Sequence, residues 1–142
     1  METIKKNEYK SEIFHSQKGL VSVIIPVYNG ESRLEELIKS LMNQTYKKIE
    51  IIAVDNNSRD NSVKILEILN KEKIPLRIFL NKQNEGYCGG CNKGIENANG
   101  EFLLFLSQDR IMNFDWIEKT VDEMNNDEKT GCIIGKVVRE GA

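Results

Sequence analysis

The sequence predicts an α/β domain built on a mainly parallel β-sheet with flanking helices. Short apolar runs rich in β-branched residues alternate along the chain with segments whose apolar residues recur at helical spacing. The runs are unbroken, which is typical of strands covered on both faces. With 142 residues, of which 39% are apolar and 30% charged, the chain has the composition of one globular domain. Regular alternation of strand and helix implies parallel strands joined by right-handed crossovers.

The first strand–helix–strand unit lies within residues 20–55. The run LVSVIIPVY at residues 20–28 predicts the first strand. Ser32 and Glu35 then fit a capping box at the start of a helix. Five apolar residues share one face of that helix: Leu34, Leu37, Ile38, Leu41 and Met42. The run IEIIAVD at residues 49–55 predicts a second buried strand.

The second unit repeats this order. Asp60 is placed to cap a second helix, and Pro75 closes it. Residues 76–81 predict a third strand, and a glycine-rich loop then leads into a helix that ends near Gly100. The apolar positions of the second helix are Val63, Ile65, Leu66, Ile68 and Leu69.

The last part of the chain extends the same alternation. Residues 101–107 predict a fourth strand, and residues 131–138 predict a fifth. Between them, four apolar residues predict one more helix: Phe114, Ile117, Val121 and Met124. The expected architecture is therefore a Rossmann-like sheet.

Composition excludes several function classes. The formal net charge is −2, and no run of five like charges occurs, so we expect no nucleic-acid partner. The longest apolar runs, at residues 20–28 and 102–106, are far shorter than the ~20 residues of a membrane span. The polar, lysine-rich residues 1–19 contain no apolar signal core, so we expect a cytoplasmic chain with reduced cysteines.

Polar segments follow each of the first four predicted strands. They occupy residues 26–29, 55–60, 81–86 and 107–110 and are rich in Asn and Asp. Ligands of open parallel sheets bind beyond the carboxyl ends of the strands, so these segments predict a binding site at one sheet edge. The alternative is that Asn and Asp serve there as turn formers and helix caps.

Two phosphate-binding motifs fail on this sequence. Residues 86–93 lack the glycine that a Walker loop places before its lysine, and PVYNGESR after the first strand lacks the dinucleotide fingerprint, which disfavours NAD. The remaining glycines, Gly86, Gly89, Gly90 and Gly94, either expose backbone amides to a ligand or allow tight helix-on-sheet packing.

Two further groups are candidates for chemistry. Cys88 and Cys91 form a C-x-x-C pair at a predicted helix start, where thiols can be redox-active, although small buried cysteines also pack like alanine. Asp109 directly follows an apolar strand beside Gln108 and Arg110, which favours a metal ligand or charged-substrate contact over a helix cap. Asn113 and Asp115 are available as alternative caps.

From about residue 21 to residue 138 the chain resembles the nucleotide-sugar-binding N-terminal half of family 2 glycosyltransferases, which have the GT-A fold. The matching segments are VSVIIPVYNG, IEIIAVDNNSRDNS and NEGYCGGCNKGIENANGEFLLFLSQD, in the family's order and spacing. The variants of these motifs are similar to those of rhamnosyltransferase-like members. The resemblance divides the chain into an N-terminal extension, residues 1–19, and a GT-A domain, residues 20–142.

The resemblance also implies roles for individual residues. Pro26, Val27 and Tyr28 would line the base and ribose pocket, and Asp55 would accept a hydrogen bond from the pyrimidine N3–H. The remaining nucleotide-binding residues would be Asn57, Asn84, Gly86 and Asn92. Asp109 matches the last carboxylate of the family's D-x-D motif, which holds Mg²⁺ or Mn²⁺ against the diphosphate.

The chain departs from the family pattern in two ways. Ser107 replaces the first D-x-D carboxylate, which implies weaker metal binding or its loss. The chain also ends 33 residues after Asp109, whereas family members continue into an acceptor-binding half that carries the general base. We therefore expect no catalytic base in this sequence and a chain truncated after its donor-binding part.

Three functions follow as hypotheses. The first is inverting transfer of a sugar from a UDP- or dTDP-linked donor to a saccharide or lipid-linked acceptor in surface polysaccharide synthesis, peripheral to the inner membrane face. The second is a non-catalytic nucleotide-binding or interaction module that kept this fold. The third is a thiol oxidoreductase using Cys88 and Cys91, which requires a lowered thiol pKa.

Overall fold

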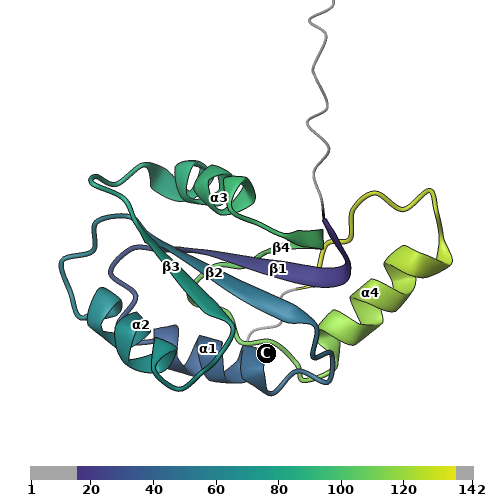
Figure 1. Cartoon of the computed structure of the whole chain (residues 1–142), viewed down its shortest axis with the longest axis horizontal. Helices are drawn as coiled ribbons and strands as arrows, with labels where there is room; N and C mark the ends of the chain where they lie inside the picture. Colours follow the sequence, from purple (N-terminus) through teal and green to yellow (C-terminus); the bar gives the residue numbers. More distant parts are fainter. Residues whose placement is uncertain (1–15, 137–142) are drawn as a thin grey trace, which may run out of the picture.

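The computed structural model describes residues 16–136, which form a four-stranded sheet with one helix on one face and three helices on the other (Figure 1). The predicted α/β class is confirmed, because all strand pairs are parallel and the strand order is β3-β2-β1-β4. The elements in chain order are β1 (Gln17–Val27), α1 (Leu34–Met42), β2 (Ile49–Asp55), α2 (Ser62–Asn70), β3 (Leu76–Leu80), α3 (Gly86–Glu96), β4 (Gly100–Phe105) and α4 (Trp116–Asn126).

The central strand β1 is covered on both faces, as its unbroken apolar sequence predicts. Val23 and Ile25 are fully buried against the larger core, to which α1, α2 and α4 contribute side chains. Ile24 points to the opposite face, where it joins a smaller core beside Ile95 of α3. Alternate side chains of a strand point to opposite faces, so the helices on each side of the sheet pack on a different set of β1 side chains.

Helix α3 lies close to β1 because glycines face the strand. A Cβ added to Gly94 would lie 2.3 Å from Ile24 Cγ2, and one added to Gly90 would lie 2.8 Å from Pro26 Cβ. The packing explanation for these two glycines therefore holds. Gly86 differs, since it has a positive φ of 72° and no atom within 4 Å of the position of an added Cβ.

Two predicted local features are wrong. Residues 131–136 form no strand, and residues 137 and 138 of the predicted fifth strand lie outside the described residues. Gly135 packs instead against Trp116: a Cβ added to Gly135 would lie 2.8 Å from Trp116 Cζ2. The Ser32 capping box is also absent: α1 begins at Leu34 without a side-chain cap, and the carbonyl of Gly30 accepts the Leu34 N–H in a backbone turn.

Two further observations concern the ends of the predicted domain. Strand β1 begins at Gln17, three residues before the predicted strand. Residues 1–15 of the predicted N-terminal extension lie outside the described residues. None of the helices within residues 16–136 combines the length and the apolar character that crossing a bilayer requires.

A polar network centred on Glu50 joins three strands on the α3 face. The Glu50 carboxylate accepts hydrogen bonds from Ser22 Oγ at 2.6 Å and from the Asn99 backbone N–H at 2.7 Å. Arg77 of β3 lies 3.3 Å from the same carboxylate. Burial raises the pKa of Glu50, but these hydrogen bonds outweigh burial and hold the pKa below its ordinary value.

We expect Glu50→Ala to lower the free energy of unfolding by about 2 kcal/mol at pH 7, because it leaves the partners of the carboxylate unpaired. The folded-state pKa of Glu50 is lowered, so its contribution is present above the unfolded-state pKa and is lost as the pH falls through the folded-state pKa. Urea unfolding between pH 3 and pH 7 measures this. A Glu50→Ala variant that loses stability with acid as steeply as the wild type would contradict the prediction.

Candidate functional site

The polar segments after the strands meet at the carboxyl edge of the sheet, as the sequence predicts. The Asn56 backbone N–H donates to the Val27 carbonyl at 2.8 Å, and the Asn81 backbone N–H donates to the Asp55 carbonyl at 2.8 Å. The Asn81 side chain donates to Asn56 Oδ1 at 2.9 Å. These bonds tie the ends of β1, β2 and β3 together.

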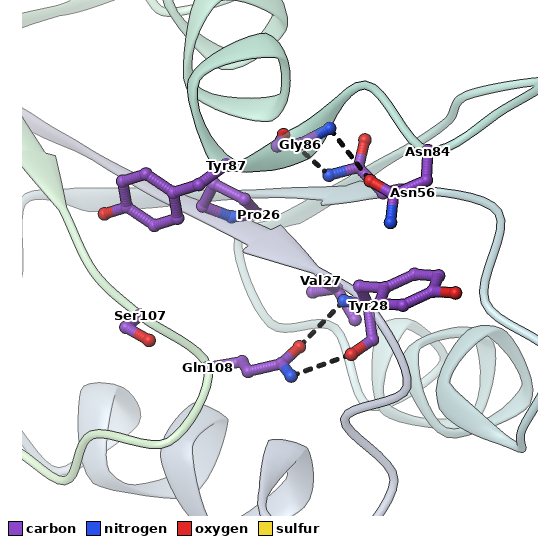
Figure 2. Close-up of a pocket in the computed structure, with 9 residues that line it drawn as sticks. All are labelled: Pro26, Val27, Tyr28, Asn56, Asn84, Gly86, Tyr87, Ser107 and Gln108. Atoms are coloured by element: carbon purple, nitrogen blue, oxygen red, sulfur yellow. Dashed lines mark hydrogen bonds between the residues drawn. The ribbon is translucent and has the colours of Figure 1, made fainter.

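A pocket of about 280 Å³ opens at this edge (Figure 2). It lies where the strand order reverses, because β1 has β2 on one side and β4 on the other. Open α/β sheets bind their ligands at such a switch point. The pocket is lined by Pro26, Val27, Tyr28, Asn56, Asn84, Gly86, Tyr87, Ser107 and Gln108.

Asn56 holds the α3 side of the pocket in place. It is 2% exposed, and its Nδ2 donates to the Gly86 carbonyl at 3.0 Å (Figure 2). The Asn84 Oδ1 atom accepts the Gly86 backbone N–H at 2.8 Å. Gly86 is thus fixed through both backbone groups at the start of α3, in a positive-φ conformation that glycine adopts at little cost.

Asp55 lies at the end of β2 and is 2% exposed. Its Oδ2 atom accepts the Ser58 backbone N–H at 2.9 Å. Within residues 16–136, its Oδ1 atom is buried without a hydrogen-bond partner. A buried carboxylate oxygen without a donor is costly, so a ligand N–H that reached this atom would remove that cost.

Some of the Asn and Asp side chains at this edge do serve as turn formers. Asn29 and Asn57 adopt positive φ values of 49° and 61°, which asparagine tolerates better than most residues. Asn29 Oδ1 accepts the Arg59 backbone N–H at 2.9 Å. Asp60 Oδ1 accepts the Ser62 backbone N–H at 2.9 Å, at the start of α2. The alternative explanation from turn formation therefore accounts for part of the pattern.

The chain after β4 places Asp109 next to two residues that line the pocket, Ser107 and Gln108. Its carboxylate is 60% exposed and accepts a hydrogen bond from Ser107 Oγ at 2.6 Å. This hydrogen bond, aided by the charge of Arg110, holds the pKa of Asp109 below its ordinary value. The carboxylate is therefore ionised at neutral pH.

The oxygen atoms of Asp109 and Ser107 could supply only part of the coordination of a divalent cation. Mg²⁺ and Mn²⁺ prefer oxygen ligands, and Asp109 offers an ionised carboxylate beside the Ser107 hydroxyl. In the part of the chain that the structure describes, no three His, Cys, Asp or Glu residues are grouped as metal ligands. Ligand oxygens and water would have to complete the coordination of an ion held by Asp109.

The two cysteines of α3 differ in environment. Cys88 is exposed and Cys91 is buried. Burial raises the pKa of the Cys91 thiol above its ordinary value. This direction is opposite to the lowered thiol pKa that the oxidoreductase hypothesis requires.

The structure brings together part of the predicted set of site residues. Pro26, Val27, Tyr28, Asn84 and Gly86 line the pocket. Four others do not line it: Asp55 is buried, and the exposed residues Asn57, Asn92 and Asp109 lie on the surrounding segments.

Four residues that line the pocket are not among the predicted nucleotide-binding residues. They are Asn56, Tyr87, Ser107 and Gln108. Asn56 and Gln108 do lie in the polar segments that the sequence marks as ligand-binding. Their contacts join segments far apart in the chain, and the sequence gives no further signal for these contacts.

The comparisons with known proteins assign this architecture to a family. The model of the family described as glycosyl transferase family 2 matches residues 22–142. The chain belongs to glycosyl transferase family 2. The predicted family is therefore confirmed, whereas the rhamnosyltransferase-like variant and the truncation stay predictions.

Relatives in this family include an uncharacterized glycosyltransferase of Haemophilus influenzae. It is 38% identical over 106 residues, which are 74% of this chain and 42% of the relative. A GalNAc(5)-diNAcBac-PP-undecaprenol beta-1,3-glucosyltransferase of Campylobacter jejuni is 40% identical over 90 residues, 63% of this chain and 29% of that protein. The chain thus spans less than half the length of these two relatives.

Similarity to solved structures confirms the GT-A fold. S. aureus TarS (residues 1–349) in complex with UDP matches with a TM-score of 0.72 and 28% identity, over 85% of this chain and 38% of that one. The same TarS segment with UDP-GlcNAc matches with a TM-score of 0.70 and 26% identity, over 85% of this chain and 37% of that one.

Proposed function

We propose that this chain is the donor-binding part of an inverting glycosyltransferase that uses a UDP- or dTDP-linked sugar. The observation that carries the proposal is the pocket at the switch point, where the lining residue Ser107 donates a hydrogen bond to the Asp109 carboxylate. Membership of glycosyl transferase family 2 and the similarity to TarS bound to UDP support it. Residues 20–142 would form the donor-binding domain.

The proposed nucleotide pose follows from the lining. Pro26 and the half-exposed Tyr28 offer an apolar and aromatic surface for the base and ribose. Asp55 Oδ1 would accept the pyrimidine N3–H after a small shift of the side chains that bury it. Four residues of the surrounding segments would contact the ribose and diphosphate: Asn57, Asn84, Gly86 and Asn92.

Asp109 would hold the Mg²⁺ or Mn²⁺ ion, completed by diphosphate oxygens and water. Such an ion, when bound, stabilises the negative charge of the departing nucleoside diphosphate. Ser107 contributes a hydroxyl in place of a second carboxylate, and its hydrogen bond lowers the pKa of Asp109. This residue pair therefore favours weak metal binding that depends on the nucleotide.

We propose that the acceptor-binding site and the general base belong to a part of the intact enzyme outside this donor-binding domain. Inversion requires a base to take the acceptor's proton, and the described pocket lining contains no carboxylate. This chain spans 42% and 29% of two relatives, one of which is named for an undecaprenol-linked acceptor. We therefore propose a saccharide or lipid-linked acceptor, used at the inner membrane face in surface polysaccharide synthesis.

Calorimetric titration of the chain with UDP and dTDP, with and without Mn²⁺, tests this function. We expect binding that Mn²⁺ strengthens, and Asp109→Asn should remove the effect of Mn²⁺. Asp122→Asn, which changes an exposed carboxylate on α4, is the matched control and should behave as the wild type. The absence of nucleotide binding under all these conditions would contradict the proposal.

A non-catalytic nucleotide-binding module is the second candidate, and Ser107 is the residue that favours it. With only one carboxylate, that of Asp109, beside Ser107, such a module would bind a nucleotide without a metal ion. Nucleotide binding that is equally strong with Mn²⁺ and with EDTA would support this candidate over the enzyme.

Ser107→Asp is expected to strengthen Mn²⁺ binding in the presence of UDP about tenfold, because a second carboxylate oxygen joins the site. The Ser107 hydroxyl lies 2.6 Å from Asp109 Oδ1, so the new carboxylate would adjoin the first. Titration of Mn²⁺ into the UDP-saturated chain measures the change. Unchanged or weaker Mn²⁺ binding would show that these two positions do not share an ion.

A further inference from the structure

We propose that Gln108 is a positioning residue of the donor site, which fastens the segment after β4 to Tyr28. It would thereby fix the position of the Asp109 carboxylate relative to Tyr28 in the pocket wall. The inference rests on the proposed function, since it assigns Gln108 a part in nucleotide and metal binding.

The Gln108 carboxamide makes two hydrogen bonds to one residue of β1's exit (Figure 2). Its Oε1 atom accepts the Tyr28 backbone N–H at 2.8 Å, and its Nε2 atom donates to the Tyr28 carbonyl at 2.9 Å. A carboxamide carries a donor and an acceptor side by side, as the backbone of a neighbouring strand does. The side chain thus substitutes for a strand at this position.

The sequence of β1 explains why the backbone hydrogen bonds between β1 and β4 end before Tyr28. Regular pairing with β4 ends at Ile24 and Phe105, followed by a bond from the Leu106 N–H to the Ile24 carbonyl at 3.0 Å. Backbone groups of alternate residues face the same neighbour, so Pro26 is the next residue to face β4, and proline has no N–H to donate. The ladder stops there, and Pro26 and Ser107 line the pocket that opens.

Gln108 closes this gap at Tyr28, two residues beyond Pro26. Tyr28 contributes to the pocket wall, and Asp109 directly follows Gln108 in the chain. One side chain therefore connects the part of the site assigned to the base and ribose with the part assigned to the diphosphate and its cation. This connection predicts that nucleotide and Mn²⁺ binding are coupled through Gln108.

Gly30 is fitted to the same carboxamide. A Cβ added at Gly30 would lie 2.7 Å from Gln108 Oε1 and 3.0 Å from its Cδ. Its φ is not among the positive values of the described residues, so alanine is compatible with the backbone there. Gly30→Ala thus displaces the carboxamide without altering Gln108 itself.

The experiment compares Gln108→Ala with Gln17→Ala, a control that truncates an exposed glutamine at the far end of β1. In the full chain, NMR measures the hydrogen-exchange rate of the Tyr28 backbone amide. Calorimetry measures the affinity for UDP in the presence of Mn²⁺ and in the presence of EDTA. Gln108→Ala should speed Tyr28 exchange about tenfold and lower UDP affinity in Mn²⁺ about tenfold. The Mn²⁺-to-EDTA affinity ratio should fall towards one, and Gln17→Ala should match the wild type.

A double-mutant cycle makes the test specific. Gly30→Ala should reproduce these losses in the wild-type background and add nothing in the Gln108→Ala background. If the wild type binds UDP but Gln108→Ala leaves Tyr28 exchange or the affinity ratio unchanged, the role of Gln108 is overturned while the proposed function stands. If the wild type binds no UDP, the proposed function is overturned, and the positioning role with it.

Discussion

Replacing Asp55 with asparagine is expected to weaken UDP binding about 30- to 150-fold, which corresponds to about 2–3 kcal/mol. Asp55 Oδ1 is buried without a partner among the described residues, so an incoming N3–H would find a carboxylate oxygen with no hydrogen bond to break. An asparagine can keep an oxygen for the Ser58 N–H but places an N–H group where the base also presents one. Two donors facing each other cannot form the bond.

Titration calorimetry at neutral pH measures this loss, and urea unfolding shows that the fold is retained. Asp127→Asn is the control, because Asp127 also accepts a nearby backbone N–H, from Lys129 at 2.9 Å, but lies after α4. The control should bind UDP as the wild type does. Equal UDP affinity in Asp55→Asn and the wild type would remove Asp55 from the site.

Gly94→Ala is expected to lower the free energy of unfolding by about 3 kcal/mol. In most helix interiors this substitution is stabilising, by about 1 kcal/mol, because alanine is the better helix former. Here the new methyl group would lie 2.3 Å from Ile24 Cγ2, inside the contact between α3 and the central strand. Packing therefore outweighs helix propensity, and α3 is forced away from β1.

Urea unfolding of two further variants separates packing from propensity. Gly131→Ala should be nearly neutral, because no atom lies within 4 Å of its added Cβ. Ile24→Ala removes Cγ2 and Cγ1, the two atoms nearest to the new methyl group, so Gly94→Ala should cost less in that background than alone. A Gly94→Ala chain as stable as the wild type would contradict the close approach of α3.

The sequence predicts elements well where the signal is local and repeated. The strand predicted at residues 49–55 coincides with β2, because a run rich in β-branched apolar residues is followed by turn-forming residues. The segment at residues 131–136 also contains apolar residues but forms no strand, since a strand requires a partner backbone, and Gly135 lies against Trp116 instead. Ser32 failed as a cap because a backbone turn at Gly30 supplied the acceptor.

The same distinction applies to the site. Pro26, Tyr28 and Gly86 could be placed at the pocket because ligands bind beyond the carboxyl ends of strands. The contacts of Asn56 with Gly86 and of Gln108 with Tyr28 could not, because they join segments 30 and 80 residues apart. Such hydrogen bonds depend on the assembled sheet, so no spacing rule along the chain reveals them.

A crystal structure of the chain soaked with UDP and Mn²⁺ tests most directly whether the switch-point pocket is the donor site. We expect UDP in the pocket at the carboxyl ends of β1 and β4, with its uracil beside Pro26 and Tyr28. Its N3–H would donate to Asp55, and its diphosphate would point towards Asp109. UDP bound elsewhere on the chain, or an empty pocket at a UDP concentration that saturates binding in solution, would contradict the proposed site.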